Sequence, residues 1–385
     1  MKTLILSCNT GQGHNSCAQA IKEYYDLQGD ECVIEDALHF ISTPFSDFLS
    51  WGHVTMYRHF PWLFRIGYRY SEKHPALFRE TSGIYKLLTL GTEQIYQYIK
   101  AGGYDTVICT HVFTGVMLTD VLKKHPMPIA TCLVVTDYTC SPSVKDSKLD
   151  LYFIPASSLS CEFECAAIKD EQIRSVGIPL RQFFYQSDSR EKAKHTFGIP
   201  ENHTHLLMMC GSMGCGPLKE LAQRLSRKVS PDVDISIVCG TNRLLEKKLE
   251  RKFSDDSNIH VLGYVQNMSL LMDSADLYLT KPGGISVTEA SLKNLPMVLI
   301  DAVAGCEEFN RNYYVRHGGA KTGENNRELT KLTLELLTKQ EQIDKMRNRL
   351  SELQKENASA LIYYQMNELL EKKQNEHDLK EQQEA

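Results

Sequence analysis

Apolar and polar residues alternate in blocks along the chain, and the first 180 residues set the pattern. Several short runs are apolar almost throughout. Between them apolar residues recur three and four positions apart, as after Asn15 and over 115–124, which predicts helices. Apolar strands separated by helices are typical of a parallel sheet covered on both faces. The expected strands are 3–7, 31–35, 104–111, 128–137, 151–154 and 173–176.

The same pattern starts again near His205. Further strands are expected at 205–210, 234–239, 259–262, 275–279 and 296–300, with helices between them. The segment Gly177-Ile178-Pro179-Leu180-Arg181 ends the first series. We therefore expect α/β domains at 1–178 and 179–358, both doubly wound and Rossmann-like, followed at 359–385 by an amphipathic helix and a polar tail.

Composition narrows the class of protein. With 385 residues, 42% of them hydrophobic and 24% charged, the chain can bury two cores, and its net charge of −5 argues against general nucleic-acid binding. It has no run of about 18 apolar residues and enters its first strand without a hydrophobic leader. Its twelve scattered cysteines lack a zinc spacing, so we expect reduced thiols, a cytoplasmic location and no metal.

Residues 40–100 interrupt the alternation. They hold both tryptophans and are rich in tyrosine, phenylalanine and arginine. Aromatic rings suit headgroup depth in a bilayer, and interleaved cations suit anionic lipids. The segment predicts a peripheral membrane contact; the alternative is an insertion whose aromatics pack on the domain and whose arginines are solvated. The residues singled out are Trp51, Arg58, Trp62, Arg65 and Arg69.

A Pro-Gly-Gly turn lies between an apolar run and a helical pattern in the second half. It occupies the stretch Lys281-Pro282-Gly283-Gly284-Ile285-Ser286-Val287-Thr288-Glu289. Backbone N–H groups at such a helix start favour a phosphate, and glycines let it approach closely. Glu289 could accept hydrogen bonds from a vicinal diol such as a ribose. The alternative is a plain turn capped by Ser286 or Thr288.

Other glycine loops follow other expected strands. Gly13 and His14 end the first loop, Gly211, Ser212 and Gly214 form another, and Gly240 follows the strand 234–239. Gly11-Gln12-Gly13-His14 lacks the third glycine of a dinucleotide fingerprint, so it gives only weak support for NAD binding.

His14 could donate to a phosphate, act as a base on a hydroxyl, or simply cap its helix. Asp137 is its candidate partner or an alternative base. Both Asp137 and His111 fall at strand carboxyl ends, where α/β sheets gather ligand groups.

Several motifs occur together in a recognisable order, and the chain thereby resembles glycosyltransferase family 28. The similarity is to plant-type monogalactosyldiacylglycerol synthases and bacterial processive diacylglycerol glucosyltransferases. The motifs are Gly11-Gln12-Gly13-His14, Val135-Thr136-Asp137, Gly177-Ile178-Pro179-Leu180-Arg181, Val261-Leu262-Gly263-Tyr264-Val265 and Lys281-Pro282-Gly283-Gly284-Ile285-Ser286-Val287-Thr288-Glu289-Ala290.

The resemblance implies a GT-B fold, in which two Rossmann-like domains face a cleft. It implies inverting transfer of a hexose from UDP-glucose or UDP-galactose to 1,2-diacylglycerol, on the inner face of the cell membrane, with no cofactor. His14 would lie at the reaction centre with Asp137, and Trp51, Arg58, Trp62, Arg65, Arg69 and His111 would serve the acceptor or the membrane.

Carried over by position, the resemblance also assigns the donor site. Gly283, Gly284 and Ile285 would meet the diphosphate, Glu289 the ribose and Val265 the uracil. The full set of donor-site candidates is Gly13, Gly211, Ser212, Gly214, Gly240, Val265, Lys281, Gly283, Gly284, Ile285, Ser286, Thr288, Glu289, Glu307 and Asn310.

One departure from the family concerns the sugar. Where relatives usually have Gln-Glu, this chain has Cys306-Glu307, so Glu307 and Asn310 would take over recognition of sugar hydroxyls. The sequence does not identify which sugar is transferred. Alternatives to the diacylglycerol enzyme are a UDP-N-acetylglucosamine 2-epimerase, a lipid-intermediate N-acetylglucosaminyltransferase and a non-catalytic UDP- or lipid-binding relative.

Overall fold

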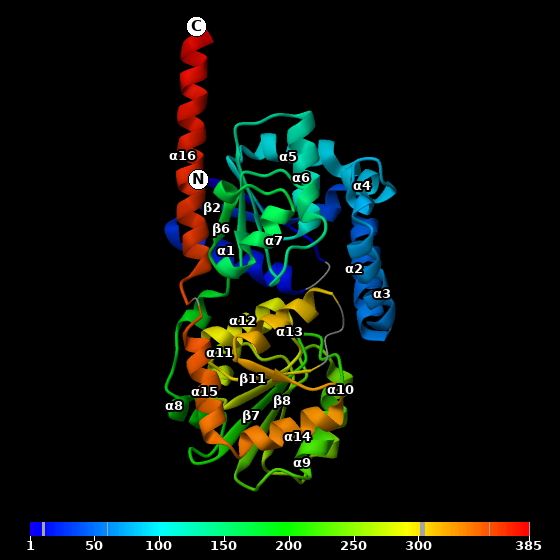
Figure 1. The fold of residues 1–385 in the computed structure, drawn as a ribbon, viewed down its shortest axis with the longest axis vertical. Coiled ribbons are helices and arrows are strands. Elements are labelled where there is room, and N and C mark those ends of the chain that lie inside the picture. The colour runs from blue at the N-terminus through cyan, green and yellow to red at the C-terminus, as the bar shows by residue number, and fades with distance from the viewer. Residues whose placement is uncertain (10–11, 60, 301–304, 354, 385) are drawn as a thin grey trace. The chain divides into compact units, whose positions relative to one another are not determined.

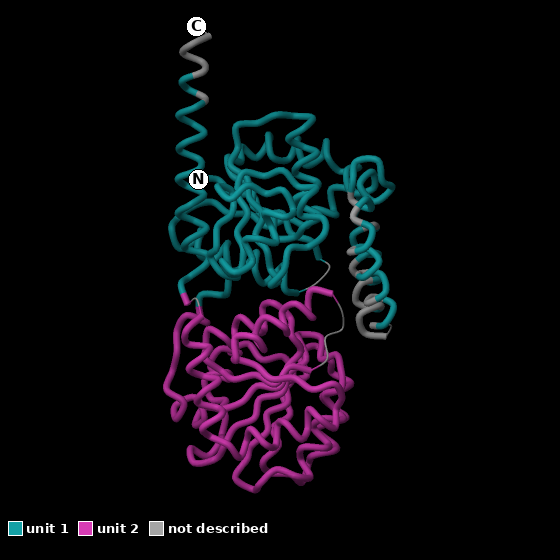
Figure 2. Tube along the Cα trace, in the orientation of Figure 1, with its two compact units in different colours: residues 1–182, 356–385 teal, residues 183–355 magenta. Residues whose placement is uncertain are grey.

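The computed structural model describes residues 1–9, 12–59, 61–300, 305–353 and 355–384. The chain forms two compact units (Figure 2). Unit 1 contains residues 1–182 and 356–385, and unit 2 contains residues 183–355. Residues 356–385 thus return to unit 1 after unit 2 is complete.

Unit 1 is built on a six-stranded parallel sheet in the order β2-β1-β3-β4-β5-β6 (Figure 1). Every residue of β3, β4 and β5 is buried, as expected for strands covered on both faces. The strands are β1 (Lys2–Ser7), β2 (Glu31–Asp36), β3 (Thr106–Cys109), β4 (Ala130–Val134), β5 (Leu151–Ile154) and β6 (Ile173–Ser175).

The helices of unit 1 include the crossovers and the insertion. They are α1 (Gln12–Gln28), α2 (Thr43–His59), α3 (Pro61–Lys73), α4 (Gly83–Leu88), α5 (Thr92–Gly102), α6 (Val112–Lys124), α7 (Ser160–Cys165) and α16 (Ala358–Glu384). The last helix packs against α1: Tyr363 Oη donates to Asp30 at 2.8 Å, and Ser359 Oγ to the Ala20 carbonyl at 3.2 Å. No described helix is long and apolar enough to cross a membrane.

Unit 2 repeats the architecture with the strand order β12-β11-β10-β7-β8-β9, again all parallel. The strands are β7 (Thr204–Met209), β8 (Val233–Val238), β9 (Ile259–Leu262), β10 (Leu277–Thr280), β11 (Met297–Leu299) and β12 (Ala320–Thr322). The helices are α8 (Arg190–Thr196), α9 (Leu218–Ser226), α10 (Arg243–Lys252), α11 (Met268–Ser274), α12 (Gly284–Leu292), α13 (Cys306–Arg316), α14 (Asn326–Leu337) and α15 (Gln340–Ser351).

Both sheets reverse their strand order at one point, between β1 and β3 in unit 1 and between β7 and β10 in unit 2. Such a reversal leaves a crevice at the carboxyl ends of the two strands, where doubly wound sheets bind ligands. The prediction of two doubly wound α/β domains is confirmed. The candidate loops that carry His14, His111, Gly211 and the Pro-Gly-Gly turn follow these four strands.

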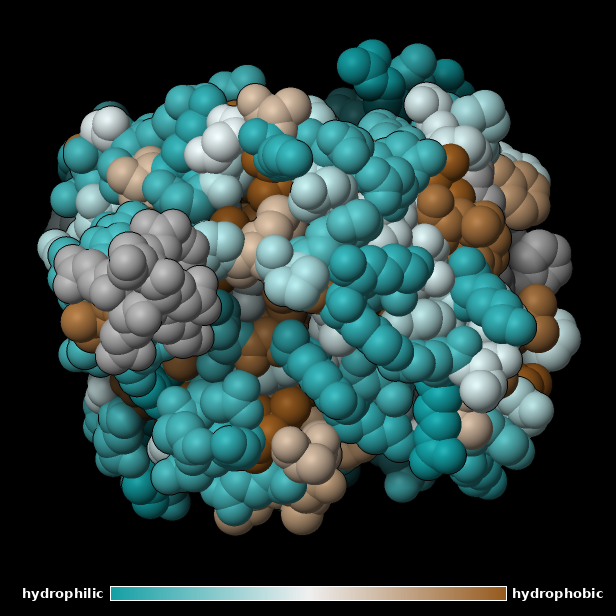
Figure 3. Space-filling model, turned by 90° about the horizontal axis from the view of Figure 1, so that it is seen from above, coloured by the Kyte–Doolittle hydropathy of each residue, from teal (hydrophilic) through white to brown (hydrophobic). Residues whose placement is uncertain are grey.

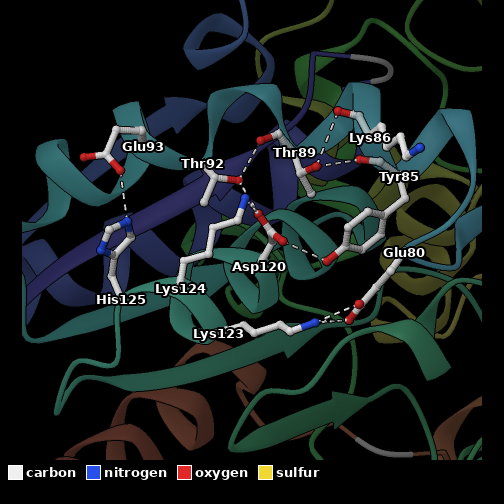
Figure 4. A network of polar contacts seen from close by, with 10 residues as sticks. All are labelled: Glu80, Tyr85, Lys86, Thr89, Thr92, Glu93, Asp120, Lys123, Lys124 and His125. Atoms are coloured by element: carbon white, nitrogen blue, oxygen red, sulfur yellow. Dashed lines mark hydrogen bonds and ion pairs between the residues drawn. The ribbon is translucent and has the colours of Figure 1, made fainter.

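A buried carboxylate, Asp120 on α6, joins three helices of unit 1 (Figure 4). It accepts hydrogen bonds from Tyr85 Oη of α4 at 2.9 Å, from Thr92 Oγ1 at the start of α5 at 2.6 Å, and from Lys124 Nζ at 2.6 Å. Burial opposes ionisation, but these donors together lower the pKa of Asp120. The carboxylate therefore holds α4 and α5 on α6.

We expect Asp120→Asn to destabilise unit 1 by about 2 kcal/mol at neutral pH, because the amide supplies one acceptor oxygen to three donors. Since the pKa is depressed, wild type itself loses this contribution as the pH falls through the folded-state pKa, and the difference should shrink in acid. Urea unfolding at neutral and at acidic pH measures the difference in free energy of unfolding between the variant and wild type. Glu93→Gln is the control: Glu93 forms an exposed ion pair with His125 (Figure 4), so the stability of this variant should stay near that of wild type. Equal losses of stability in the two variants would contradict the role assigned to Asp120.

Candidate functional site

His14 lies on α1, just after β1. Its Nδ1 is 2.8 Å from the Thr110 carbonyl oxygen and 3.1 Å from Thr136 Oγ1. A carbonyl oxygen can only accept, so Nδ1 carries the hydrogen and Nε2 of the neutral ring carries the lone pair. The ring is thus fixed as the tautomer that a general base requires.

His111 lies beside His14. Their ring centroids are 4.5 Å apart and the rings meet edge to face, with an interplanar angle of 72°. His111 Nδ1 accepts the backbone N–H of Phe113 at 3.0 Å and so caps α6. Two histidines from the ends of β1 and β3 therefore meet at the point where the sheet order reverses.

The charge state of His14 follows from its surroundings. Burial lowers the pKa of His14, and the negative charge of Asp137 together with the hydrogen bond to Thr110 opposes this only in part. The ring is therefore neutral at neutral pH and able to accept a proton. Asp137 acts on His14 as a nearby negative charge. This agrees with the predicted position of Asp137 at the carboxyl end of a strand, which is β4.

In unit 2, α12 starts at the Pro-Gly-Gly turn without a side-chain cap. Gly283 is the N-cap residue and has no side chain, while Thr288 Oγ1 donates to the Gly284 carbonyl at 2.7 Å. The N-cap residue itself thus contributes no side-chain cap to α12. Backbone N–H groups in the first turn of α12 are left at the positive end of the helix dipole.

Lys281 joins this turn to the loop after β7. Its Nζ donates to Glu307 Oε1 at 2.7 Å. A Cβ atom at Gly211 would lie 2.7 Å from Lys281 Cε, so the Lys281 side chain lies directly over Gly211, whose φ of +70° favours glycine. The two predicted glycine segments of unit 2 therefore come together around one cation.

A second contact, made by α13, also holds the Pro-Gly-Gly turn in place. Asn310 is fully buried on α13, and its Nδ2 donates to the Pro282 carbonyl at 3.0 Å. Glu307 is also buried, with 7% of its surface exposed. Both side chains lie within the protein, where they support the turn and Lys281.

The loops after β7 and β8 interlock. A Cβ atom at Gly240 would lie 2.1 Å from the Ser212 carbonyl oxygen, and one at Gly214 would lie 2.3 Å from the Cys239 carbonyl oxygen. Thr241 N donates to the Ser212 carbonyl at 2.8 Å. Gly211, Ser212, Gly214 and Gly240 therefore form one rigid platform next to the start of α12. Val265 is half-buried in the loop after β9.

Glu289 is the remaining charged candidate on α12, one turn beyond Ile285 and Ser286. Its carboxyl has no hydrogen bond or ion pair with any described residue, and burial raises its pKa to about 8. A carboxyl held mostly neutral at pH 7 beside unpaired backbone donors marks this as a functional-site candidate.

The insertion of unit 1 exposes much of its apolar surface. Among the side chains that the structure describes, nine of the sixteen exposed large hydrophobic ones lie between Phe48 and Leu90, including Trp51 at 65% and Trp62 at 60% exposure. Figure 3 shows hydrophobic atoms on the flank where α2–α4 lie. The alternative in which these aromatics pack on the domain is wrong for both tryptophans. Arg69 is exposed, and the side chains of Arg58 and Arg65 lie outside the described residues.

Sequence reasoning missed two partners of His14. Thr136 stands next to the candidate Asp137, and its position at a strand end was the available signal. The Thr110 carbonyl is backbone, so no residue type could have indicated it. No group of three or more metal-ligating side chains occurs among the described residues.

Comparison with known proteins adds two family matches, one for each half of the chain. The model of the monogalactosyldiacylglycerol (MGDG) synthase family matches residues 14–180, and that of the glycosyltransferase family 28 C-terminal domain matches residues 205–383. The first match begins at His14, and the second contains every glycine segment of unit 2.

Curated relatives are similar along most of the chain. A processive diacylglycerol beta-glucosyltransferase of Bacillus pumilus is 25% identical and aligns with 94% of this chain and 93% of its own length. The chloroplastic monogalactosyldiacylglycerol synthase 1 of Arabidopsis thaliana is 25% identical over 97% of this chain and 72% of its own length.

Solved structures share the fold. The MurG protein of Acinetobacter baumannii superposes with a TM-score of 0.66 at 13% identity, covering 96% of this chain and 100% of its own. A UDP-GlcNAc 2-epimerase from Neisseria meningitidis gives 0.63 at 14% identity, covering 96% and 100%. The expected GT-B fold is confirmed.

The raised pKa of Glu289 predicts a pH-dependent stability. A carboxyl with a higher pKa in the folded state costs stability as the pH rises from its unfolded value, about 4.3, towards about 8. Glu289→Gln should therefore match wild type near pH 5 and be more stable by on the order of 2 kcal/mol near pH 9. Urea unfolding at the two pH values tests this. Glu250→Gln, an exposed control on α10, should change little; a Glu289→Gln difference equal at both pH values would refute the assignment.

Proposed function

Since the chain belongs to the family of monogalactosyldiacylglycerol synthases and processive diacylglycerol glucosyltransferases within glycosyltransferase family 28, we propose that it transfers a hexose from a UDP-sugar to the hydroxyl of 1,2-diacylglycerol. The observation that carries the proposal is that each unit matches the family and also bears its own candidate site. His14 is held as a base in unit 1, and an uncapped glycine turn opens a helix in unit 2.

The reaction begins at His14. Nε2 takes the proton of the acceptor hydroxyl while that oxygen attacks the anomeric carbon from the face opposite UDP. The bond from the anomeric carbon to the diphosphate oxygen breaks, and UDP leaves with the electron pair, so the configuration inverts. The Thr110 carbonyl and the charge of Asp137 stabilise the imidazolium that forms.

The donor binds unit 2. N–H groups at the start of α12, around Gly283, Gly284 and Ile285, receive the diphosphate and stabilise the charge on departing UDP. Val265 meets the uracil, and Glu289 accepts hydrogen bonds from the ribose. Because the ionised carboxylate is the better acceptor, UDP binding lowers the pKa of Glu289 and releases a proton.

The acceptor reaches the site from a membrane surface. The exposed rings of Trp51 and Trp62 suit headgroup depth, and Arg58, Arg65 and Arg69 suit anionic lipid. We place the enzyme as a peripheral protein on the inner face of the cell membrane. A 2-epimerase, whose fold is similar, acts on a soluble substrate and has no use for such a face.

The base assignment is tested with His14→Gln. Transfer of labelled hexose to diacylglycerol should fall by about 10²- to 10⁴-fold, because the amide cannot accept the proton, while UDP affinity should hold. Glu289→Ala should instead weaken UDP binding about tenfold or more, through lost hydrogen bonds. His125→Gln, the same substitution elsewhere in unit 1, is the control. Hexose transfer at the wild-type rate by His14→Gln would contradict the assignment of His14 as the base.

The sugar preference is tested at Cys306, the first residue of α13. Cys306→Gln adds an amide that can hydrogen-bond a sugar hydroxyl, so the ratio of kcat/KM for UDP-glucose and UDP-galactose should shift by about fivefold or more. Cys161→Gln, at an exposed position on α7, is the control. A ratio unchanged by Cys306→Gln would exclude this position from sugar selection.

A further inference from the structure

Helix α10 of unit 2 has an unusual distribution of charge. Five of its ten residues are cations, and all five are exposed. At about 100° per residue they fall within one half of the helix, without an intervening carboxylate. Around that half the side chains follow in the order Arg243, Lys247, Arg251, Leu244, Lys248 and Lys252.

The other half of α10 carries the side chains that pack on the protein, together with Glu246 and the exposed Glu250. Leu249 is fully buried, Phe253 is 5% exposed, and Leu245 packs against the core of unit 2. These contacts orient the helix, so the cations point to solvent together. Leu244, which lies among them, is 74% exposed, the highest value among the exposed large hydrophobic residues that the structure describes.

None of the five cations forms an ion pair with a described residue. Several helical cations elsewhere do: Lys22 pairs with Asp26, Arg224 with Glu220, and Lys339 with Glu335, each one turn away. On α10, Arg243 and Lys247, Lys247 and Arg251, and Lys248 and Lys252 are like charges four positions apart, and each such pair costs helix stability, about 0.2–0.5 kcal/mol. The two carboxylates of the helix, Glu246 and Glu250, stand three positions after Arg243 and Lys247 and lie outside its basic half.

We propose that this face of α10 is a membrane-docking surface of unit 2, which binds anionic lipid through its cations and inserts Leu244 among the headgroups. Charge complementarity selects an anionic partner, and the exposed leucine within the basic arc favours a bilayer over a nucleic acid. The inference rests on the proposed transfer to membrane-resident diacylglycerol. It adds a contact independent of the aromatic insertion, which lies in unit 1.

The position of α10 gives the contact a consequence for the donor site. Its N-cap residue Asn242 accepts the Leu245 N–H at 3.1 Å, and its Nδ2 donates to the Gly214 carbonyl at 3.2 Å. The helix is therefore fastened to the glycine platform formed by the loops after β7 and β8. Docking of α10 sets the distance of that platform from the bilayer.

The test uses the full chain carrying Lys247→Gln, Lys248→Gln and Arg251→Gln together, since glutamine keeps helix propensity. Cosedimentation with phosphatidylcholine vesicles containing roughly one-third phosphatidylglycerol should show binding at least about tenfold weaker than wild type. Leu244→Ser should weaken binding while leaving its salt dependence, which reports the cations, as in wild type.

The matched control removes the same three charges from exposed positions on α9 and α14, as Lys219→Gln, Arg327→Gln and Lys331→Gln, and should bind as wild type does. Two measurements separate this inference from the proposed function. All variants should bind UDP and glycosylate diacylglycerol in neutral detergent micelles at wild-type rates, while only the α10 variants lose transfer on vesicles.

Three results would overturn the inference: equal vesicle binding by the α10 triple variant and wild type, equal loss in the matched control, or no binding of wild type to anionic vesicles. So would a Leu244→Ser variant that binds unchanged, or polyuridylate that displaces wild type from vesicles at matched charge. Absence of glycolipid product in micelles would instead refute the proposed function.

Discussion

The hydrogen bond from His14 to the Thr110 carbonyl is the contact on which the chemistry proposed for unit 1 depends. It exists because β1 and β3 pair in parallel with Leu6 opposite Cys109, and because Thr110 N donates to the Leu6 carbonyl at 3.1 Å. That register brings the end of β3 next to the first turn of α1. The sheet therefore determines which nitrogen of His14 carries hydrogen, and so which nitrogen can act as a base.

Unit 2 has the same architecture as unit 1, but its loops form a candidate anion-binding site. An anion needs backbone N–H groups that nothing else occupies, and a side chain at Gly211, Gly214 or Gly240 would collide with its neighbours. Lys281 and Asn310 then hold the Pro-Gly-Gly turn from two sides. The proposed donor site is thus held in place by the protein's own contacts, which would reduce the free energy spent on ordering when UDP binds.

Local sequence predicted the alternation of strands and helices well, because buried parallel strands are apolar throughout and their helices keep a 3.6-residue period. It also pointed to His14, His111 and the glycine segments, which follow strands. It could not predict that Lys281 covers Gly211, or that α16 returns to pack on α1, since both depend on contacts between residues far apart in sequence.

The most direct test of the account is mass spectrometry of the lipids after wild-type protein has been incubated with UDP-glucose or UDP-galactose and diacylglycerol vesicles. The account predicts that diacylglycerol gains one or more hexose residues from at least one donor, with an equivalent release of UDP and a new glycosidic bond of inverted configuration. Consumption or epimerisation of either UDP-sugar without any glycosylated lipid would contradict it.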